Sequence, residues 1–170
     1  VTGAGANVIS RSGQGEIRIG SAVLGRVVDY GVSDANNMGA AMAPAAADTI
    51  LDFFNNTTRS PRDYDLIVTG DLGTLGSRIL KDLLLKKGLD IDANHVDCGE
   101  LIYNIDEDEY QGGSGAGCSA VVFNSYIYKK MLKGEYSRIL LVTTGALLST
   151  TSTQQGDTIP GIAHLIELYR

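Results

Sequence analysis

The stretch GGSGAGCSA occupies residues 112–120, and the apolar helical pattern VVFNSYIY follows it directly. Four of its nine residues are glycine, which lets the backbone turn tightly and lets another segment or a ligand approach it closely. The first turn of a helix leaves unpaired N–H groups and a partial positive charge, which suit an anion. Cys118 lies at this helix start, a position that favours a lowered thiol pKa; the alternative is a buried cysteine that acts as a small hydrophobe. We therefore expect a functional site at this glycine-rich entrance to a buried helix.

The segments around this stretch predict strands and helices in a layered α/β fold with a mixed sheet. β-Branched and apolar runs indicate strands, and residues with high helix propensity at helical spacing indicate helices. Residues 89–111 are the least regular part. The expected strands are 1–10 and 16–30, joined as a hairpin by a turn at 12–15, then 65–69, 138–144 and 159–169; the expected helices are 40–54 with Pro44 in its first turn, 77–87 closed by Gly88, and 120–134.

The composition describes an ordinary globular chain. Its 170 residues suffice for one domain with its own core. Hydrophobic residues make up 44% and charged residues 20%, which argues against disorder. The net charge is −6 and nothing supplies a basic face, so we expect no nucleic-acid partner. No stretch approaches the length of about 18 apolar residues that a membrane-spanning helix needs. The two cysteines are too few for a disulfide scaffold.

Two strand ends supply further candidates for the site, because ligands of open α/β sheets favour the carboxyl ends of strands. Here these ends are Gly70-Asp71 and Thr144-Gly145. Asp71 is a pocket candidate, with an N-cap of the following segment as the alternative. Ser114 and Ser119 offer hydroxyls beside the N–H groups of the glycine-rich turn, and together these donors form the favoured anion contact.

The remaining polar residues predict neither a metal site nor a cofactor site. His95 and Cys98 stand three apart, a metal-like interval, but no second pair accompanies them. The acidic run at 106–109 lacks the glycine and the alternation of a calcium loop and is expected to be a solvated surface. No G-x-G-x-x-G opens a helix near Gly3, so no dinucleotide is expected. His164 in the final strand is expected to be a core residue.

Three of these segments together resemble the second half of the thiolase-like, or condensing-enzyme, family. They are Gly70-Asp71 after a strand, residues 112–120 before a buried helix, and Gly145 after the penultimate strand. Proteins of that family comprise two similar halves. The resemblance implies that residues 16–170 form a C-terminal thiolase-like domain, and that residues 1–15 are a remnant of the first half's last strand and turn.

The resemblance also implies where catalytic groups would lie. Enzymes of the family carry a His or Asn just after the strand that ends here at Gly70 and another near Gly113, and the thiolases add a Cys near Thr143. The only histidines of this chain are His95 and His164, outside these segments. General acid–base catalysis and an oxyanion hole depend on such groups. The resemblance therefore implies a fold without catalysis; an acyl-CoA condensing enzyme or thiolase, and a purely structural half, are the alternatives.

More narrowly, residues 38–50, 65–72, 97–99, 112–120 and 144–149 resemble a sporulation family of spore-forming bacteria. That resemblance implies binding of dipicolinic acid, or its calcium chelate, for uptake into the developing spore, in a pocket between the two halves. It also implies peripheral attachment to the spore inner membrane, beside membrane proteins of the same sporulation system. An apolar face without its other half predicts that this chain self-associates, a homodimer being one form. The expected ligand-binding residues are Asp71, Gly113, Ser114, Cys118, Ser119 and Thr144.

Overall fold

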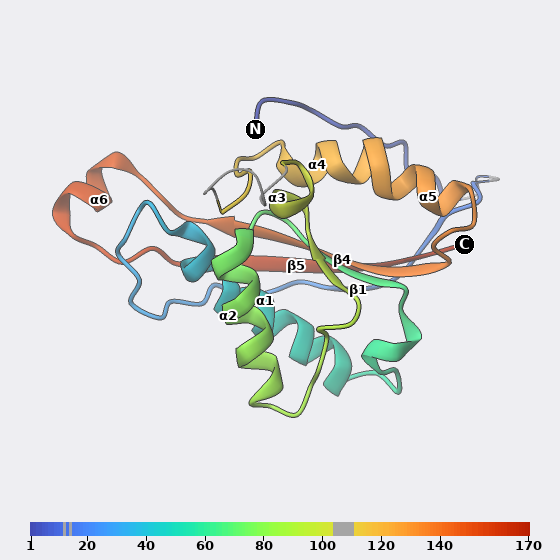
Figure 1. Ribbon diagram of the computed structural model, residues 1–170, viewed down its shortest axis with the longest axis horizontal. Helices are drawn as coiled ribbons and strands as arrows, with labels where there is room; N and C mark the ends of the chain where they lie inside the picture. The colour runs from blue at the N-terminus through green and yellow to red at the C-terminus, as the bar shows by residue number, and fades with distance from the viewer. Residues whose placement is uncertain (12, 14, 104–110) are drawn as a thin grey trace.

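A mixed sheet organises the chain, as the computed structural model of residues 1–11, 13, 15–103 and 111–170 shows (Figure 1). Within these residues the strand order is β1-β5-β4-β2-β3. β5 runs antiparallel to β1 and β4, whereas β2 runs parallel to β4 and β3. This confirms the layered α/β fold with a mixed sheet. The strands are β1 (Arg18–Val23), β2 (Leu66–Thr69), β3 (His95–Asp97), β4 (Arg138–Ala146) and β5 (Gly161–Tyr169).

Helices cover both faces of the sheet (Figure 1). One face carries α1 (Met38–Asn55) and α2 (Gly73–Leu85); the other carries α4 (Cys118–Val122), the π-helical turn η2 (Phe123–Ile127) and α5 (Tyr128–Leu132). Side chains alternate between the faces of a strand. Leu140 and Val142 of β4 accordingly belong to the α1–α2 core, and Ile139 and Leu141 to the core under α4 and α5. The continuous apolar run of β4 is thus the pattern of a strand buried on both faces.

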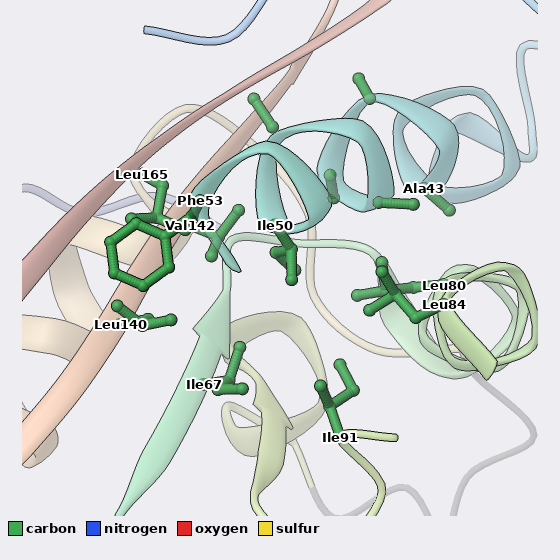
Figure 2. Packing of buried hydrophobic residues seen from close by; sticks show 14 of the residues in the cluster. Ala43, Ile50, Phe53, Ile67, Leu80, Leu84, Ile91, Leu140, Val142 and Leu165 are labelled. Carbon is green, nitrogen blue, oxygen red and sulfur yellow. The ribbon is translucent and has the colours of Figure 1, made fainter. Parts of the chain in front are cut away.

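Large side chains fill the core between α1 and the sheet. Ile50 and Phe53 of α1 lie against strand residues such as Val142 and Leu165 (Figure 2). A Cβ atom on Gly39 would lie under 3.0 Å from the Leu72 carbonyl oxygen, so α1 passes against the start of α2 with no room for a larger residue. This close approach sets the position of the β2–α2 turn, where the sequence places Asp71.

Five predictions about elements are wrong, two of them outright and three in their bounds. Residues 1–10 form no strand, and β1 pairs with β5 instead of forming the predicted hairpin; residues 12 and 14 of the expected turn lie outside the described residues. The helix expected at 40–54 begins at Met38, so Pro44 lies in its interior. The helix expected at 77–87 begins at Gly73, and the helix expected at 120–134 begins at Cys118 and contains η2.

Tertiary contacts explain the position of the first residues. The first residues pack closely on α4. A Cβ on Gly5 would lie under 3.0 Å from the Ala120 carbonyl oxygen, so this approach needs glycine. The side-chain amide of Asn124, in the π-helical turn η2, donates to that same carbonyl at 2.8 Å. The Ala120 carbonyl oxygen therefore has a side-chain hydrogen-bond partner. Gly88 closes α2 as expected, with a φ of 81° and its N–H donating to the Leu85 carbonyl at 2.9 Å.

Three elements lie in two segments for which no regular structure was predicted. The irregular stretch 89–111 contains β3 and the short helix α3 (Cys98–Leu101), and the polar stretch 149–158 contains α6 (Thr150–Gln155). The acidic run at 106–109 lies outside the described residues. β3 has only three residues, too few to show the alternating or apolar pattern of a strand. Its position in the sheet depends on its pairing with β2.

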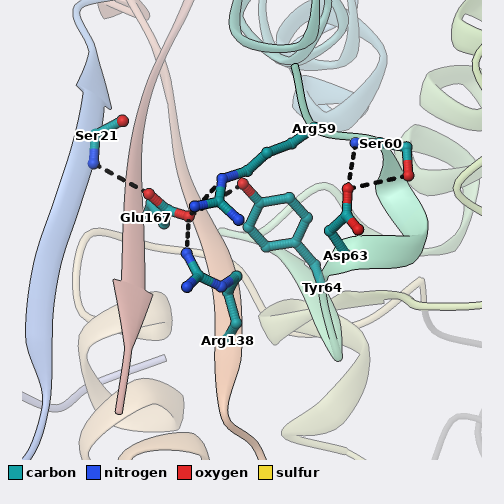
Figure 3. A network of polar contacts seen from close by, with 7 residues as sticks. All are labelled: Ser21, Arg59, Ser60, Asp63, Tyr64, Arg138 and Glu167. Carbon is teal, nitrogen blue, oxygen red and sulfur yellow. Dashed lines mark hydrogen bonds and ion pairs between the residues drawn. The ribbon is translucent and has the colours of Figure 1, made fainter. Parts of the chain in front are cut away.

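The buried carboxylate of Glu167 binds β1, β4 and β5 together at the end of the sheet where β4 begins (Figure 3). It accepts from the N–H of Ser21 at 3.2 Å, from Arg138 Nη1 at 2.5 Å and from the Tyr64 hydroxyl at 3.2 Å, with Arg59 Nε at 3.5 Å. Burial raises the pKa of Glu167, but the hydrogen bonds and the arginine charges outweigh it and leave that pKa lowered. The carboxylate is therefore ionised and paired.

Candidate functional site

Three strand ends meet at one edge of the sheet. β3, β2 and β4 are parallel neighbours, with Thr69 paired to Asp97 on one side and to Val142 on the other. The carboxyl end of β2 leads into Asp71, that of β3 ends at Asp97, and Thr144 lies near the corresponding end of β4. Such an edge is where open α/β sheets bind ligands. The two strand ends selected from the sequence are therefore brought together.

Asp71 links both strand ends to the glycine-rich turn. Its Oδ2 accepts from the Ser114 hydroxyl at 2.9 Å and from the Gly115 N–H at 3.0 Å, and its Oδ1 accepts from the Thr144 hydroxyl at 3.1 Å. Its own N–H donates to Thr144 Oγ1 at 3.2 Å. The structure thus places Asp71, Ser114 and Thr144, three residues selected from the sequence, in direct contact.

The glycines of the turn serve a close approach between backbones. The Gly113 N–H donates to the Gly99 carbonyl at 2.7 Å, and a Cβ on Gly99 would lie under 3.0 Å from the Gly113 carbonyl oxygen. Gly112 adopts a φ of 122°, a conformation that glycine alone adopts readily. One segment that approaches the turn is therefore α3, which the sequence analysis did not predict; the first residues of the chain, such as Gly3 beside Gly117, also lie against it.

A second carboxylate, that of Asp97, lies beneath this cluster and is only 1% exposed. It accepts four hydrogen bonds, from the Thr69 hydroxyl at 2.6 Å and from the N–H groups of Leu72, Gly73 and Gly99 at 2.9, 3.0 and 2.9 Å. Sequence reasoning missed Asp97 as a site residue. Its N-cap position at the start of α3 is the signal that could have found it, since Asp is a preferred N-cap residue.

His95 extends the Asp97 network. Its Nε2 lies 3.0 Å from Thr69 Oγ1, and the hydroxyl hydrogen of Thr69 is donated to Asp97. Nε2 therefore carries the hydrogen of this bond, and the low pKa of the ring keeps it neutral near pH 7. Burial lowers its pKa to about 4, against an opposing effect of Asp97. Among the residues that the structure describes, no three His, Cys, Asp or Glu side chains are grouped so as to hold a metal ion.

The expectation of a lowered pKa for Cys118 is wrong. The thiol is fully buried, and burial, reinforced by the negative charges of Asp71 and Asp97, raises its pKa to about 11. Its sulfur lies 3.8 Å from the Gly113 carbonyl oxygen, to which it donates weakly. Burial also raises the pKa of Cys98. Cys118 therefore supports the turn beneath Gly113 as a small buried group.

Ser119 lies apart from the cluster formed by Asp71, Ser114 and Thr144. It lines a cavity of about 720 Å³ on the α4 side of the sheet, together with Arg11, Phe123, Tyr128 and Leu168. None of the three cluster residues lines that cavity. The structure therefore separates Ser119 from the hydroxyl of Ser114, with which the sequence analysis grouped it.

The family model described as stage V sporulation protein AD matches residues 1–169. This chain belongs to the stage V sporulation protein AD family. It is 52% identical over 164 residues to the stage V sporulation protein AD of Bacillus subtilis (strain 168), a match that covers 96% of this chain and 48% of that protein. The chain thus spans about half the length of that curated relative.

This family member also resembles a solved enzyme structure. It is similar to 3-oxoacyl-[acyl-carrier-protein] synthase III from Aquifex aeolicus VF5, with 11% sequence identity and a TM-score of 0.47, over 94% of this chain and 46% of the enzyme. No helix of the described residues is both long enough and apolar enough to cross a membrane.

Proposed function

We propose that this chain is the C-terminal half of a non-catalytic sporulation protein that binds dipicolinic acid, or its calcium chelate, for uptake into the developing spore. Membership of the sporulation family supports the cellular process. The observation that carries the site is the cluster in which Asp71 joins Ser114 and Thr144 at the carboxyl edge of the parallel strands. The other half of the protein completes the pocket over this edge.

Charge decides how such a ligand meets the cluster. Dipicolinic acid carries two carboxylates beside a pyridine nitrogen, so a free dianion is repelled by Asp71 and favoured by hydroxyl and N–H donors. In this structure the Ser114 hydroxyl donates to Asp71 and the Gly113 N–H donates to the Gly99 carbonyl. In the proposed complex the Ser114 hydroxyl turns from Asp71 to the ligand, above the buried Cys118 and beside Thr144. Carboxylate oxygens are preferred calcium ligands. Asp71 therefore meets the ligand through the calcium of the chelate or through a bridging water.

The proposal of a non-catalytic role rests on what the two histidines do. Neutral His95 donates to Thr69 beneath the cluster, and His164 Nδ1 accepts from the N–H of Gly25 at 3.1 Å. Neither histidine lies just after Gly70 or near Gly113, where the resemblance to condensing enzymes places such groups. A thioester-condensation assay on the full-length protein tests this, because turnover of an acyl-CoA substrate would replace the proposal with the condensing-enzyme alternative.

The partners proposed for the protein are its own N-terminal half and the membrane proteins of the same sporulation system, at the spore inner membrane. For this chain alone we propose self-association, including a homodimer. The side chains of Leu24, Val27, Tyr30 and Leu147 are all more than half exposed, which favours association. Light scattering over a range of concentrations tests this, and a monomeric mass throughout would contradict it.

Calorimetric titration of dipicolinic acid, with and without calcium, into the full-length protein tests the ligand. Asp71→Asn and Ser114→Ala each remove a group of the cluster, and Ser152→Ala in α6 is the matched control, since its hydroxyl contacts only Ser149 in its own segment. We expect saturable binding that both cluster variants weaken by about tenfold and the control leaves unchanged. Absence of binding by the unaltered protein would overturn the ligand proposal.

A further inference from the structure

Asp97 holds the chain on both sides of Asp71, through a side-chain hydroxyl before it and two backbone N–H groups after it. Its Oδ1 accepts from the Thr69 hydroxyl and from the Leu72 N–H, and its Oδ2 accepts from the N–H of Gly73. These donors lie two residues before Asp71 and one and two residues after it. The turn that carries Asp71 is therefore fixed by one carboxylate on a different strand, β3.

The same carboxylate fixes the opposite side of the cluster. Its Oδ2 also accepts from the Gly99 N–H, and the Gly99 carbonyl in turn accepts from the N–H of Gly113. Gly113 directly precedes Ser114, whose hydroxyl donates to Asp71. One buried group thus sets the positions of both partners of the Asp71–Ser114 pair.

We propose that Asp97 is the positioning residue of this ligand site, an inference that rests on the proposed function. Asp97 is buried and both of its oxygens accept two hydrogen bonds from the protein, so it acts on the ligand through the two segments that it holds. Binding groups must be kept close to their productive geometry by such supporting contacts, and loss of a support lowers affinity.

The pattern of acceptors makes the substitution Asp97→Asn informative. An ionised carboxylate accepts at both oxygens, whereas an asparagine keeps one oxygen and presents NH₂ donors at the other position. Whichever way the amide is turned, two of the four donors face another donor. Asp97→Asn keeps the volume of the side chain and removes the property that positions the turn and α3.

Thr69 offers a milder test of the same network. Its hydroxyl donates to Asp97 and accepts from His95. Thr69→Val removes both hydrogen bonds with little change in volume, whereas Thr69→Ser keeps the hydroxyl. A positioning role requires that the serine variant binds ligand nearly as the unaltered protein does and that the valine variant does not.

The experiment is calorimetric titration of dipicolinic acid and its calcium chelate into the full-length protein, unaltered and as Asp97→Asn, Asp71→Asn, the double variant, and the two Thr69 variants. Leu84→Ala, a buried core position in α2, is the control for loss of stability alone. We expect Asp97→Asn to weaken binding by about tenfold and to add little in the Asp71→Asn background, because both changes act on the same turn. Leu84→Ala lowers the melting temperature without changing affinity.

The outcomes separate this inference from the proposed function. Absence of binding by the unaltered protein overturns both. Binding by the unaltered protein combined with unchanged affinity of Asp97→Asn, or with fully additive effects in the double variant, overturns the role of Asp97 and leaves the proposed function standing. An affinity loss in Leu84→Ala equal to that of Asp97→Asn also overturns it, because stability alone would then explain the change.

Discussion

Asp71 and Thr144 exchange two hydrogen bonds: the Asp71 N–H donates to Thr144 Oγ1 at 3.2 Å, and that hydroxyl donates to Asp71 Oδ1 at 3.1 Å. The pair joins the turn after β2 to β4. A Cβ on Gly70 would lie 2.5 Å from Thr144 Oγ1, so the two segments approach as closely as they do only because residue 70 is glycine. The position of the Asp71 carboxylate is therefore a property of the sheet and not of a free loop.

Thr144→Val removes this exchange while keeping the shape of the side chain. The N–H and the Oδ1 of the partly buried Asp71 both lose the Thr144 hydroxyl as their hydrogen-bond partner. We therefore expect the free energy of unfolding to fall by about 1–2 kcal/mol. The neighbouring Thr143 is exposed, and its hydroxyl makes only a long bond of 3.4 Å to the His164 carbonyl. Thr143→Val is the matched control, with an expected change below about 0.5 kcal/mol. Urea unfolding of both variants measures the difference, and equal losses would contradict the role of Thr144.

Gly99→Ala tests the close approach of α3 to the glycine-rich turn. The added Cβ would lie under 3.0 Å from the Gly113 carbonyl oxygen, which is backbone and yields only if the turn moves. We expect a loss of about 2 kcal/mol in the free energy of unfolding, together with weaker binding of dipicolinic acid. In the control Gly145→Ala the added Cβ would meet Ile162 Cγ2 at an ordinary 3.5 Å. We therefore expect this variant to keep the stability and the dipicolinic acid affinity of the unaltered protein. Full stability of Gly99→Ala would show that the turn is not tightly held.

The two thiols are predicted to be unreactive in the folded protein. Cys98 and Cys118 are both fully buried, and burial raises the pKa of each. Because the thiolate is the reactive form, alkylation by iodoacetamide at pH 8 should be slow in native conditions and rapid after unfolding in guanidinium. Mass spectrometry of timed samples measures both sites separately. Rapid native labelling of Cys118 would restore the reactive thiol that its place at a helix start suggests.

The parts of the fold that the sequence predicts are those encoded locally. The run Ile139–Val142 is apolar at every position, and it forms the strand expected there. Residues 1–10 mix small, polar and apolar residues; they form no strand, and none of them pairs with a strand of the sheet, in which β1 is the neighbour of β5. Nothing within the first ten residues carries that information.

The site residues also divide into those with a local sequence signal and those set by distant contacts. The sequence predicts three of the site residues, because each lies beside a strand end or in the glycine-rich turn: Asp71, Ser114 and Thr144. Asp97 was not selected: its N-cap position is a local signal, but three of its four donors come from residues 69–73, more than twenty positions away. For Cys118 the sequence left a lowered pKa and a buried hydrophobe as alternatives, and the structure supports the buried one. The effect of a short helix start is local, whereas the burial and the two aspartates that outweigh it are set by the tertiary fold.

Glu167→Gln tests the buried ion network at the opposite end of the sheet. The change leaves Arg138 and Arg59 without their carboxylate, but both side chains keep about a third of their surface in water. We therefore expect a loss of about 2 kcal/mol in the free energy of unfolding, less than for a fully buried pair. Glu135→Gln removes the partner of Lys130 at the surface and should cost less than about 1 kcal/mol. Similar losses for the two variants would contradict a special role of the buried network.

His95 should make the stability of the protein fall as the pH drops from about 6.5 to about 4. Burial is the main cause that lowers its pKa to about 4 from the usual 6.5; Lys81 lowers it further, and Asp97 and Asp92 raise it. Between these two values the unfolded chain binds a proton at His95 that the folded chain does not, so the free energy of unfolding decreases with falling pH. The full effect is at most about 3 kcal/mol. His95→Gln keeps a donor for Thr69 and removes the titration, so its stability should depend less on pH over this range, while the two proteins differ by a constant amount above pH 7. Identical pH dependence of both proteins, measured by urea unfolding, would show that the imidazole of His95 is not held neutral by the fold.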